Sequence, residues 1–417
     1  MKQNGTHGAL SDITVIDLTQ MLSGPYATMM LADHGARVIK VEPPDGDMTR
    51  RIGVRKDDNP ALNLGAYFQS INRNKLSVCL DLKTAAGVAA LKRLVRGADV
   101  VVENYRCGVM DRLGLGYEVL RDVNPRLVYG ALRGFGDNRT GASAYIDWPA
   151  FDVVSQAMGG LMSITGPSAE QPTKAGPGIG DIVPGVMLAF GILAAVHHAR
   201  RCGSGQFVDV AMTDAVLGLC ERIVWQHSVD GRISEAEGNH HPFFCPFGIF
   251  PAANGFVALA ADSDRFFGPL CRGLGAATVA SDPRFATTEL RSQNRNQLIP
   301  VLEAITAQFS KSELSARLGG KVPYGPVMNV EDIVNDRHFK ARDMLTDVPV
   351  PGTRPLQIAG VPVKLSVTPG GVRERGPLLG EHTRACLIEA GMTADEVAPL
   401  LEAQARRKAK KVERTHE

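Results

Sequence analysis

The chain has 417 residues, 44% of them hydrophobic and 22% charged, a composition typical of a globular protein and incompatible with extended disorder. Because this length exceeds what one hydrophobic core usually supports, we expect two domains. The 46 Lys and Arg residues nearly balance the 44 Asp and Glu residues, so no global charge recruits nucleic acid or an acidic membrane, and neither is expected as a partner.

Strand and helix signals alternate through the first part of the chain. Residues 13–17 predict a buried strand, and a helix follows over 26–34 until Gly35. The pattern then predicts four further strands and one helix, namely strands at 37–42, 77–82, 99–104 and 126–134 and a helix over 85–96. Such alternation is typical of an α/β fold with a parallel, doubly wound, Rossmann-like sheet.

Further along, a glycine-rich turn and a strand precede a helix that is predicted to run to about His227. The polar stretch that begins at residue 229 marks a second, smaller α+β domain. Within it we expect a β-hairpin that turns at 254–255 and helices through 265–320. Residues 322–329 are predicted to form a strand or turn that returns toward the first domain. The basic C-terminal end is predicted to be a solvated helix.

The carboxylate of Asp181 stands between a glycine-broken turn and a long apolar helix predicted over 182–200. Pro184 suits the first helical turn, and an Asp near that position commonly accepts hydrogen bonds from free backbone N–H groups. In this first interpretation, Asp181 is a helix cap. In the other interpretation it is a chemical reagent, because turn glycines such as Gly178 and Gly180 let a ligand approach closely. The local sequence leaves both interpretations open.

Two polar segments, 71–77 and 102–117, are predicted to lie at the ends of adjacent strands, where parallel sheets usually bind ligands. Their cations would give charge-assisted hydrogen bonds to phosphates, and their apolar side chains would form a shelf for a nucleobase. The cations are Arg73, Lys75, Arg106 and Arg112, and the shelf residues are Tyr105, Met110 and Leu113. The alternative interpretation is ordinary loop charge exposed to solvent.

Other ligand chemistries find little support in the motifs. The turn after the first strand has one glycine where a dinucleotide fingerprint needs three, and Pro25 removes a backbone donor, so NAD binding is disfavoured. His240 and His241 are adjacent and lack a second ligand pair at a suitable spacing, so no metal site is expected. Their loop is instead predicted to cover a site. Serine-hydrolase, P-loop and zincin motifs do not occur in the sequence.

The seven cysteines are an odd number without paired spacing, which argues against a disulfide framework and favours a reducing environment. The N-terminal residues contain no apolar run of the signal-peptide kind. Pro184, Gly185 and Gly191 interrupt the apolar stretch of 182–196. We therefore expect a cytoplasmic protein without a membrane-spanning segment.

Several of these segments together resemble a known family. They are VIDLTQMLSGPYATMMLADHGARVIKVE, NRNKLSVCLDLK, VENYRCGVMDRLGLGYEVL, GIGD, SGQFVDVAMTDAV and VPYGPVMNVEDIVND, which occur in the family's order and span nearly the whole chain. The family is the family III CoA-transferases, which include formyl-CoA:oxalate and carnitine CoA-transferases and the related α-methylacyl-CoA racemase. Resemblance to its transferase branch implies an enzyme that takes CoA or acyl-CoA as substrate and holds no permanent cofactor.

The resemblance also implies the domain organisation and the assembly. A large CoA-binding domain would comprise residues 1–225 together with a returning C-terminal segment, 326–417. A small central domain would comprise residues 226–325. Two ring-shaped subunits would interlock as a homodimer.

By its position in the motifs, Asp181 matches the family's catalytic carboxylate, with Gly178 and Gly180 supporting the turn and an oxyanion. The matching CoA contacts are Asn72, Arg73, Lys75, Asn104, Tyr105, Arg106, Met110, Arg112 and Leu113, and the active-site cover would include Gly238, Asn239, His240 and His241. With an ordinary pKa of about 4, Asp181 would be ionised at neutral pH and would need no partner base. The implied cycle runs through an aspartyl anhydride and an aspartyl-CoA thioester.

Three positions depart from family members. Pro43 follows Glu42 where some members carry an arginine, so that CoA contact is missing or supplied elsewhere. Leu22 replaces the glutamine of the oxalate enzyme, which argues against oxalate. Phe151 stands where the racemase branch has its histidine, and a phenylalanine cannot carry a proton. The sequence therefore favours CoA transfer, with a short dicarboxylate such as succinate as a candidate donor, over a racemase-like isomerase, a CoA-binding protein without turnover or a nicotinamide oxidoreductase.

Overall fold

The computed structural model describes residues 8–53, 62, 64–352 and 354–413, with side chains described up to residue 405. Within these limits the chain forms two compact units. Unit 1 comprises the described residues of 1–161, 175–221 and 338–417, and unit 2 comprises 162–174 and 222–337. Unit 2 is longer than the predicted small domain, 226–325, because it also takes in 162–174 and the residues up to 337.

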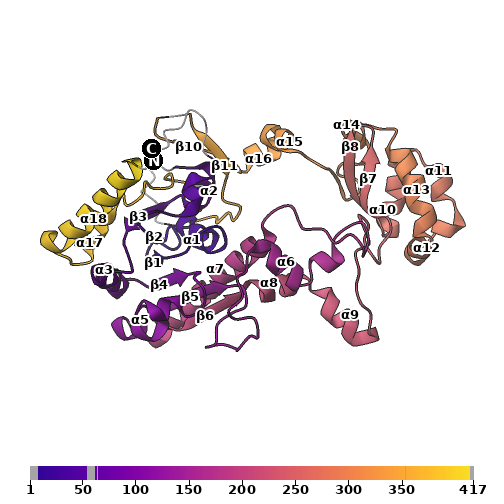
Figure 1. The fold of residues 1–417 in the computed structure, drawn as a ribbon. Coiled ribbons are helices and arrows are strands. Elements are labelled where there is room, and N and C mark those ends of the chain that lie inside the picture. Colours follow the sequence, from indigo (N-terminus) through magenta and orange to yellow (C-terminus); the bar gives the residue numbers. More distant parts are fainter. Residues whose placement is uncertain (1–7, 54–61, 63, 353, 414–417) are drawn as a thin grey trace. The chain divides into compact units, whose positions relative to one another are not determined.

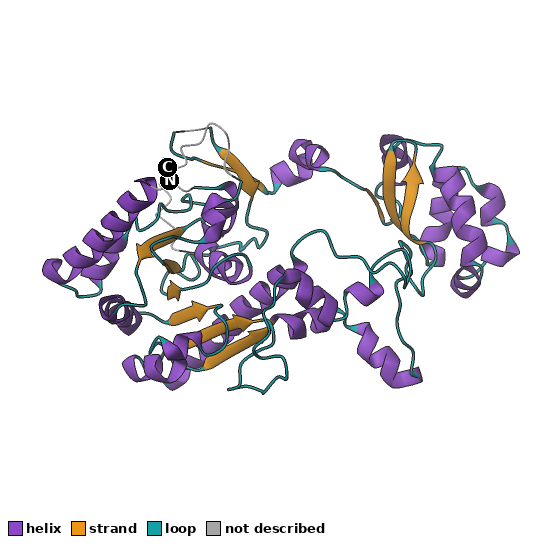
Figure 2. Cartoon of the chain, in the orientation of Figure 1, coloured by secondary structure: helices purple, strands orange, loops and turns teal. Residues whose placement is uncertain are grey.

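Unit 1 is built on a six-stranded parallel sheet (Figure 1 and Figure 2). The strands are β1 Thr14–Asp17, β2 Arg37–Glu42, β3 Lys75–Cys79, β4 Val100–Glu103, β5 Val128–Arg133 and β6 Phe207–Ala211. Their order across the sheet is β3-β2-β1-β4-β5-β6, and every neighbouring pair is parallel. The strand order reverses at β1, as in doubly wound folds. The predicted α/β, Rossmann-like sheet is confirmed.

Helices cover both faces of this sheet. They are α1 Ser23–Asp33, α2 Ala66–Asn72, α3 Ala85–Arg96, α4 Val109–Arg112, α5 Tyr117–Val123, α6 Asp152–Met158, α7 Ile179–Cys202, α8 Met212–Leu219, α17 Thr383–Glu389 and α18 Ala394–Glu413, with a 3₁₀ turn at Met48–Arg51. Helix α3 has its predicted bounds. The hydroxyl of Thr84 caps its first turn by accepting from the Gly87 N–H at 3.1 Å, and Gly97 follows its last residue.

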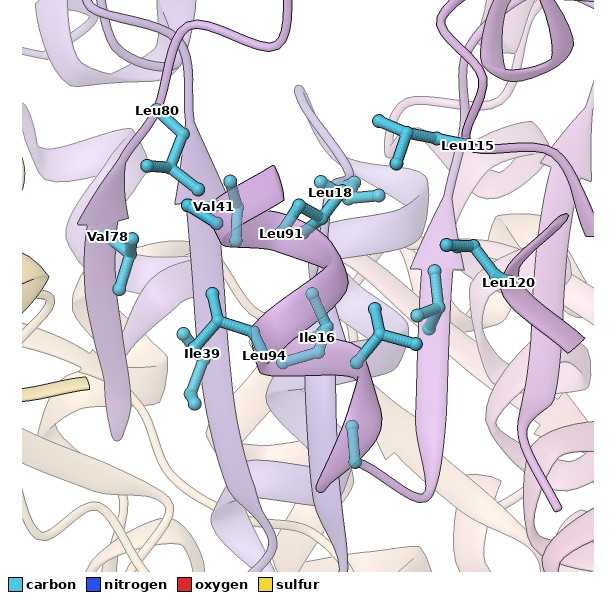
Figure 3. Packing of buried hydrophobic residues seen from close by; sticks show 14 of the residues in the cluster. Ile16, Leu18, Ile39, Val41, Val78, Leu80, Leu91, Leu94, Leu115 and Leu120 are labelled. Atoms are coloured by element: carbon cyan, nitrogen blue, oxygen red, sulfur yellow. The ribbon is translucent and has the colours of Figure 1, made fainter. Parts of the chain in front are cut away.

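Alternate strand residues supply two separate hydrophobic cores. On one face, Ile16 and Ile39 pack with Leu91 and Leu94 of α3, and helices α5, α17 and α18 contribute to the same cluster (Figure 3). On the other face, Val15 is clustered with residues of α1 and α7. This alternation is the period of two that a strand buried on both faces requires.

Helix α7 is apolar on all sides. Its inner side, including Leu188 and Ile192, is fully buried, whereas Phe190 on another side is 76% exposed. In the described part of the chain, α7 is the one helix long and apolar enough to cross a membrane by length and composition alone. Core helices of globular proteins pass the same test. The closeness of α7 to α1 supports this role, since a Cβ on Gly185 would lie 2.5 Å from the Ser23 carbonyl oxygen.

Unit 2 contains an antiparallel sheet and a group of helices. The strands are β7 Phe247–Ala252, β8 Gly255–Ala260 and β9 Tyr324–Pro326, in the order β7-β8-β9. The helices are α9 Arg222–Asp230, α10 Asp264–Leu274, α11 Ala277–Ala280, α12 Thr288–Gln293, α13 Arg295–Thr306, α14 Lys311–Leu318 and α15 Val330–Asn335, with 3₁₀ turns at Met162–Ile164 and Pro283–Phe285. Side chains of α10, α11, α13 and α14 form a third core with those of β7 and β8.

Three predictions for this part of the chain need correction. The hairpin is confirmed, but β8 already begins at Gly255, which pairs with Ala252, so its turn lies one residue earlier than predicted. Residues 322–329 do not return to unit 1, because β9 pairs antiparallel with β8. The helix predicted to run to His227 is instead two helices, α8 and α9, divided after α8 at Cys220.

The C-terminal segment packs against the edge of the large sheet. It follows a short helix, α16 Arg337–Ala341, and an antiparallel pair, β10 Leu345–Val348 and β11 Leu356–Ala359. The His382 N–H donates to the Ser77 carbonyl at 2.9 Å, and the Cys79 N–H donates to Thr383 Oγ1 at 3.0 Å. These bonds protect β3, which would otherwise present a free sheet edge.

Candidate active site

A cavity of about 310 Å³ lies at the carboxyl edge of the large sheet. Its lining residues follow the ends of four strands: Gln20–Ser23 after β1, Asn104–Cys107 after β4, Leu132–Phe135 at the end of β5 and Met212 after β6. The loop before α6, including Trp148 and Phe151, and Asp181 of α7 complete it. This is the edge at which parallel sheets usually bind ligands.

Asp181 lies in the first turn of α7. The N-cap residue of this helix is Gly178, and no side chain caps the helix there. Its backbone is held from two sides: its N–H donates to the Gly178 carbonyl at 3.1 Å, and its carbonyl accepts from Ser23 Oγ at 2.7 Å. Neither carboxylate oxygen of Asp181 has a hydrogen bond within the described residues. The side chain therefore lines the cavity and does not cap the helix in this structure.

The charge environment of Asp181 differs from the prediction. Burial, and secondarily the negative charge of Asp152, raise the pKa of Asp181 to about 7, where an ordinary value of about 4 was expected. An apolar, partly closed cavity disfavours the ionised form, and a sequence pattern does not reveal that closure. Asp181 is therefore only partly ionised at neutral pH in the absence of a ligand.

The glycines of the turn serve close packing. A Cβ on Gly180 would lie 2.6 Å from the Asp152 carbonyl oxygen, and one on Gly178 would lie 3.0 Å from Leu22 Cδ2. The Gly180 N–H donates to Asp152 Oδ1 at 2.8 Å. This N–H is already engaged, so the predicted donation from Gly180 to an oxyanion does not occur in this arrangement, and only its role in the turn is observed.

The residues after β4 divide into two groups. Asn104, Tyr105 and Arg106 line the cavity, and the amide of Asn104 bonds to both backbone groups of Gln20, at 2.9 Å and 2.8 Å. Met110 is only 2% exposed and belongs to the hydrophobic core, so it cannot form the predicted nucleobase shelf. Leu113 packs against the same core, whereas Arg112 is exposed.

The segment 71–77 does not form the predicted phosphate cradle. It leads into the start of β3, and β2 and β1 lie between β3 and β4, so the two polar segments are not at neighbouring strand ends. Asn72, Arg73 and Lys75 are at most 4% exposed. Lys75 Nζ lies 3.0 Å from Asp17 Oδ2 and 2.9 Å from Asn72 Oδ1.

Arg73 has a similar internal partner, since its Nη2 lies 2.8 Å from Asp33 Oδ2. These cations neutralise carboxylates inside unit 1. Freeing one of them for a phosphate would leave a buried charge without a partner, which is strongly unfavourable. Arg50 does not replace the CoA contact expected after Glu42, because its side chain is buried in an ion pair with Glu42 at 2.6 Å.

The predicted cover, residues 238–241, lies in unit 2. These residues line a second cavity, of about 620 Å³, together with Arg222 and parts of the antiparallel sheet. His240 Nε2 lies 3.8 Å from Glu303, and His241 Nδ1 accepts from the backbone N–H groups of the following aromatic residues. The covering role stays a prediction. No cluster of metal-ligating side chains occurs in the part of the chain that the structure describes.

Four residues in or next to the cavity were missed by sequence reasoning. Gln20 links the turns after β1 and β4, Ser23 holds Asp181, and Asp152 and Gln156 bind the turn before it. An Asp followed four residues later by a Gln is a pattern of facing helical side chains, and it could have indicated the last pair. The other contacts join residues far apart in the chain, and a single sequence carries no signal for them.

A Rossmann-like sheet with a half-buried carboxylate in a cavity at its carboxyl edge defines an α/β protein with an enzyme-like site. The sequence profile of CoA-transferase family III matches residues 10–383. The chain belongs to this family and is a CoA-transferase.

Three similar proteins illustrate the relationship. The succinyl-CoA:mesaconate CoA-transferase of Haloarcula hispanica is 46% identical over 92% of this chain and 97% of its own. The succinyl-CoA–D-citramalate CoA-transferase of Chloroflexus aurantiacus is 37% identical over 94% of this chain and 96% of its own. The crystal structure of a CAIB/BAIF family protein from Brucella suis has a TM-score of 0.81 and 34% identity, and the match covers 92% of this chain and all of that one.

Proposed function

We propose that this enzyme moves CoA from succinyl-CoA, or another short dicarboxylyl-CoA, to a carboxylic acid, with Asp181 as the nucleophile. The observation that carries the proposal is the Asp181 carboxylate, which lines the cavity without a hydrogen bond from any described residue. The names of the two relatives above support succinyl-CoA as the donor and a short dicarboxylic acid as the acceptor.

The chemistry begins with the ionised form of Asp181. One carboxylate oxygen attacks the thioester carbonyl of the donor, which forms a mixed anhydride and releases CoA thiolate. The thiolate then attacks the aspartyl carbonyl of the anhydride, which gives an aspartyl-CoA thioester and frees the donor acid. The acceptor carboxylate repeats these two steps in reverse. One thioester bond is exchanged for another, so no nucleotide is consumed.

The surroundings of Asp181 suit this role. Partial burial of the Asp181 carboxylate reduces the water that must be removed before attack, and an anhydride must be kept from hydrolysis. Exposed Arg106 at the cavity, and Arg112 beyond it on α4, are cations that remain available for the phosphates of CoA.

A racemase-like isomerase is not favoured. Proton exchange at the α-carbon of an acyl-CoA needs an acid–base group on each side of that carbon. The cavity lining, as far as the structure describes it, includes no histidine, and Phe151 stands at the N-cap of α6 beside Asp181 in this lining.

We also propose a homodimer, on the basis of one apolar surface of unit 1. The exposed large apolar side chains of α7 and α8 are Val186, Met187, Phe190, Leu193, Leu217 and Leu219. Monomeric proteins rarely leave such a group uncovered, and a second copy would bury it. Light scattering after gel filtration is expected to give twice the chain mass, and a Phe190→Glu variant is expected to weaken the association.

The test of the proposed function is a transfer assay that separates CoA esters by chromatography. Succinyl-CoA is the donor, and mesaconate, D-citramalate and oxalate are the acceptors. Wild-type enzyme is expected to form a new CoA ester with at least one short dicarboxylate, and Asp181→Ala is expected to form none. Wild-type rates in a folded Asp181→Ala variant would refute the nucleophile.

A further inference from the structure

Helix α6 binds the turn that carries Asp181 through two of its side chains. Asp152 Oδ1 accepts from the Gly180 N–H at 2.8 Å. Gln156, one helical turn further on, accepts from the Ala175 N–H with Oε1 at 2.9 Å. The two ends of the turn, residues 175 and 180, are therefore fixed by one short helix.

The two side chains are also bonded to each other. Gln156 Nε2 donates to both oxygens of Asp152, at 3.0 Å and 2.9 Å. Because the amide nitrogen is used for Asp152, the amide oxygen is directed to the Ala175 N–H, and each group fixes the orientation of the other. Gln156 is fully buried, so water does not compete for these bonds.

We propose that Asp152 and Gln156, together called the α6 clamp, are positioning residues for CoA transfer: they hold the turn so that the Asp181 carboxylate enters the cavity in a reactive orientation. The inference rests on the proposed function of Asp181 and extends it to two residues that do not themselves react. A misplacement of about 1 Å at a nucleophile costs about 100-fold in rate.

The clamp has an electrostatic consequence besides its geometric one. The Asp152 carboxylate adds to burial in raising the pKa of Asp181. From α2, Tyr67 also faces Asp181: burial and then the Asp181 charge raise the pKa of Tyr67, so its phenol stays neutral near pH 7. Asp152 is the charged group whose removal changes the ionisation of Asp181 most directly.

Two near-isosteric substitutions of the clamp therefore act in opposite directions. Asp152→Asn removes the negative charge, so the acid side of the pH–activity profile is expected to move to lower pH, by about one unit. Gln156→Glu places a second carboxylate beside Asp152 and is expected to move the profile to higher pH. A purely structural role would lower activity without moving the profile.

A third substitution tests the geometry. Gln156→Ala is expected to lower kcat by about 100-fold and to leave KM for succinyl-CoA within about twofold, because neither clamp residue lines the cavity. The control for Asp152→Asn is Asp122→Asn on α5, which removes an exposed carboxylate away from the clamp and is expected to behave as wild type. Thermal unfolding of each variant verifies that it is folded.

The experiment measures kcat and KM for transfer from succinyl-CoA between pH 5 and 9, with Asp181→Ala in parallel. Opposite shifts in the two charge variants with reduced kcat in Gln156→Ala support the clamp. Unchanged profiles and unchanged kcat in all three refute it. Activity retained by Asp181→Ala refutes the proposed function itself, so the two failures are distinguishable.

Discussion

Two carboxylates of unit 1, Asp17 and Asp181, are shielded from water, but their pKa values shift in opposite directions. Asp17, at the end of β1, is fully buried, and its oxygens contact Lys75 Nζ and the hydroxyls of Thr19 and Thr28. Burial by itself would raise the pKa of Asp17, but the charges of Lys75 and Lys40 and the hydrogen bonds from the two hydroxyls together outweigh burial and lower it. Among the described residues no cation contacts the Asp181 carboxylate, and burial raises its pKa to about 7.

The difference between Asp17 and Asp181 is the difference between a structural carboxylate and a potentially reactive one. A buried carboxylate that has cations and hydroxyl donors around it is stable as an anion and unreactive. One that lacks them is held in a less favourable state, which is typical of functional sites. The fold thus uses its buried cations on structural carboxylates and leaves Asp181 accessible to a ligand.

Removing the cation that pairs with Asp17 is expected to have the largest effect on stability. Lys75→Met leaves Asp17 buried without its closest cation, so the free energy of unfolding is expected to fall by about 3–5 kcal/mol. Urea unfolding followed by circular dichroism measures it. The control is Arg37→Met, which breaks the exposed pair with Glu389 and is expected to cost under about 1 kcal/mol. Equal stability of the two variants would contradict the structural role of Lys75.

A smaller effect is expected from crowding the turn before Asp181. The methyl group of Gly180→Ala would lie 2.6 Å from the Asp152 carbonyl oxygen, so the backbone must shift. We expect kcat to fall by about 100-fold. Gly176→Ala is the matched control, because a Cβ there meets nothing within 4 Å. Steady-state transfer assays compare the two, and equal rates would show that close packing at Gly180 does not matter for Asp181.

The smallest effect is a pH-dependent gain of stability on neutralising Asp181. Since the folded state raises the pKa of Asp181 above its unfolded value, the fold loses stability as pH rises through the interval up to about 7. Asp181→Asn removes this loss, so its advantage over wild type is expected to grow from pH 4 to pH 7. Thermal unfolding at several pH values measures the difference. A constant difference would argue against a raised pKa.

The sequence predicted the parts of the molecule that rest on local pattern. Periodicity located the strands of the large sheet, and the motif GIGD located Asp181. The predicted phosphate-binding role of Arg73 and Lys75 was wrong because their partners are distant in sequence. Lys75 pairs with Asp17, 58 residues earlier, and Arg73 pairs with Asp33, 40 residues earlier. A cation that neutralises a distant buried carboxylate has the same local pattern as one that awaits a phosphate.

The same limit applies to the site. The pKa of Asp181 depends on burial by residues after β1, β4 and β5 and on Asp152, which lies 29 positions earlier in the sequence. None of these is a neighbour along the chain. Local reasoning therefore indicates Asp181 as a candidate but does not predict its protonation.

The most direct test of the central claim is to look for the acyl group on Asp181. The enzyme is mixed with succinyl-CoA, treated with hydroxylamine and digested, and the peptide that contains residue 181 is examined by mass spectrometry. We expect an aspartyl hydroxamate at Asp181 that is absent from Asp181→Ala. Active turnover of succinyl-CoA with an unmodified Asp181, or a hydroxamate at a different residue, would contradict covalent catalysis by this carboxylate.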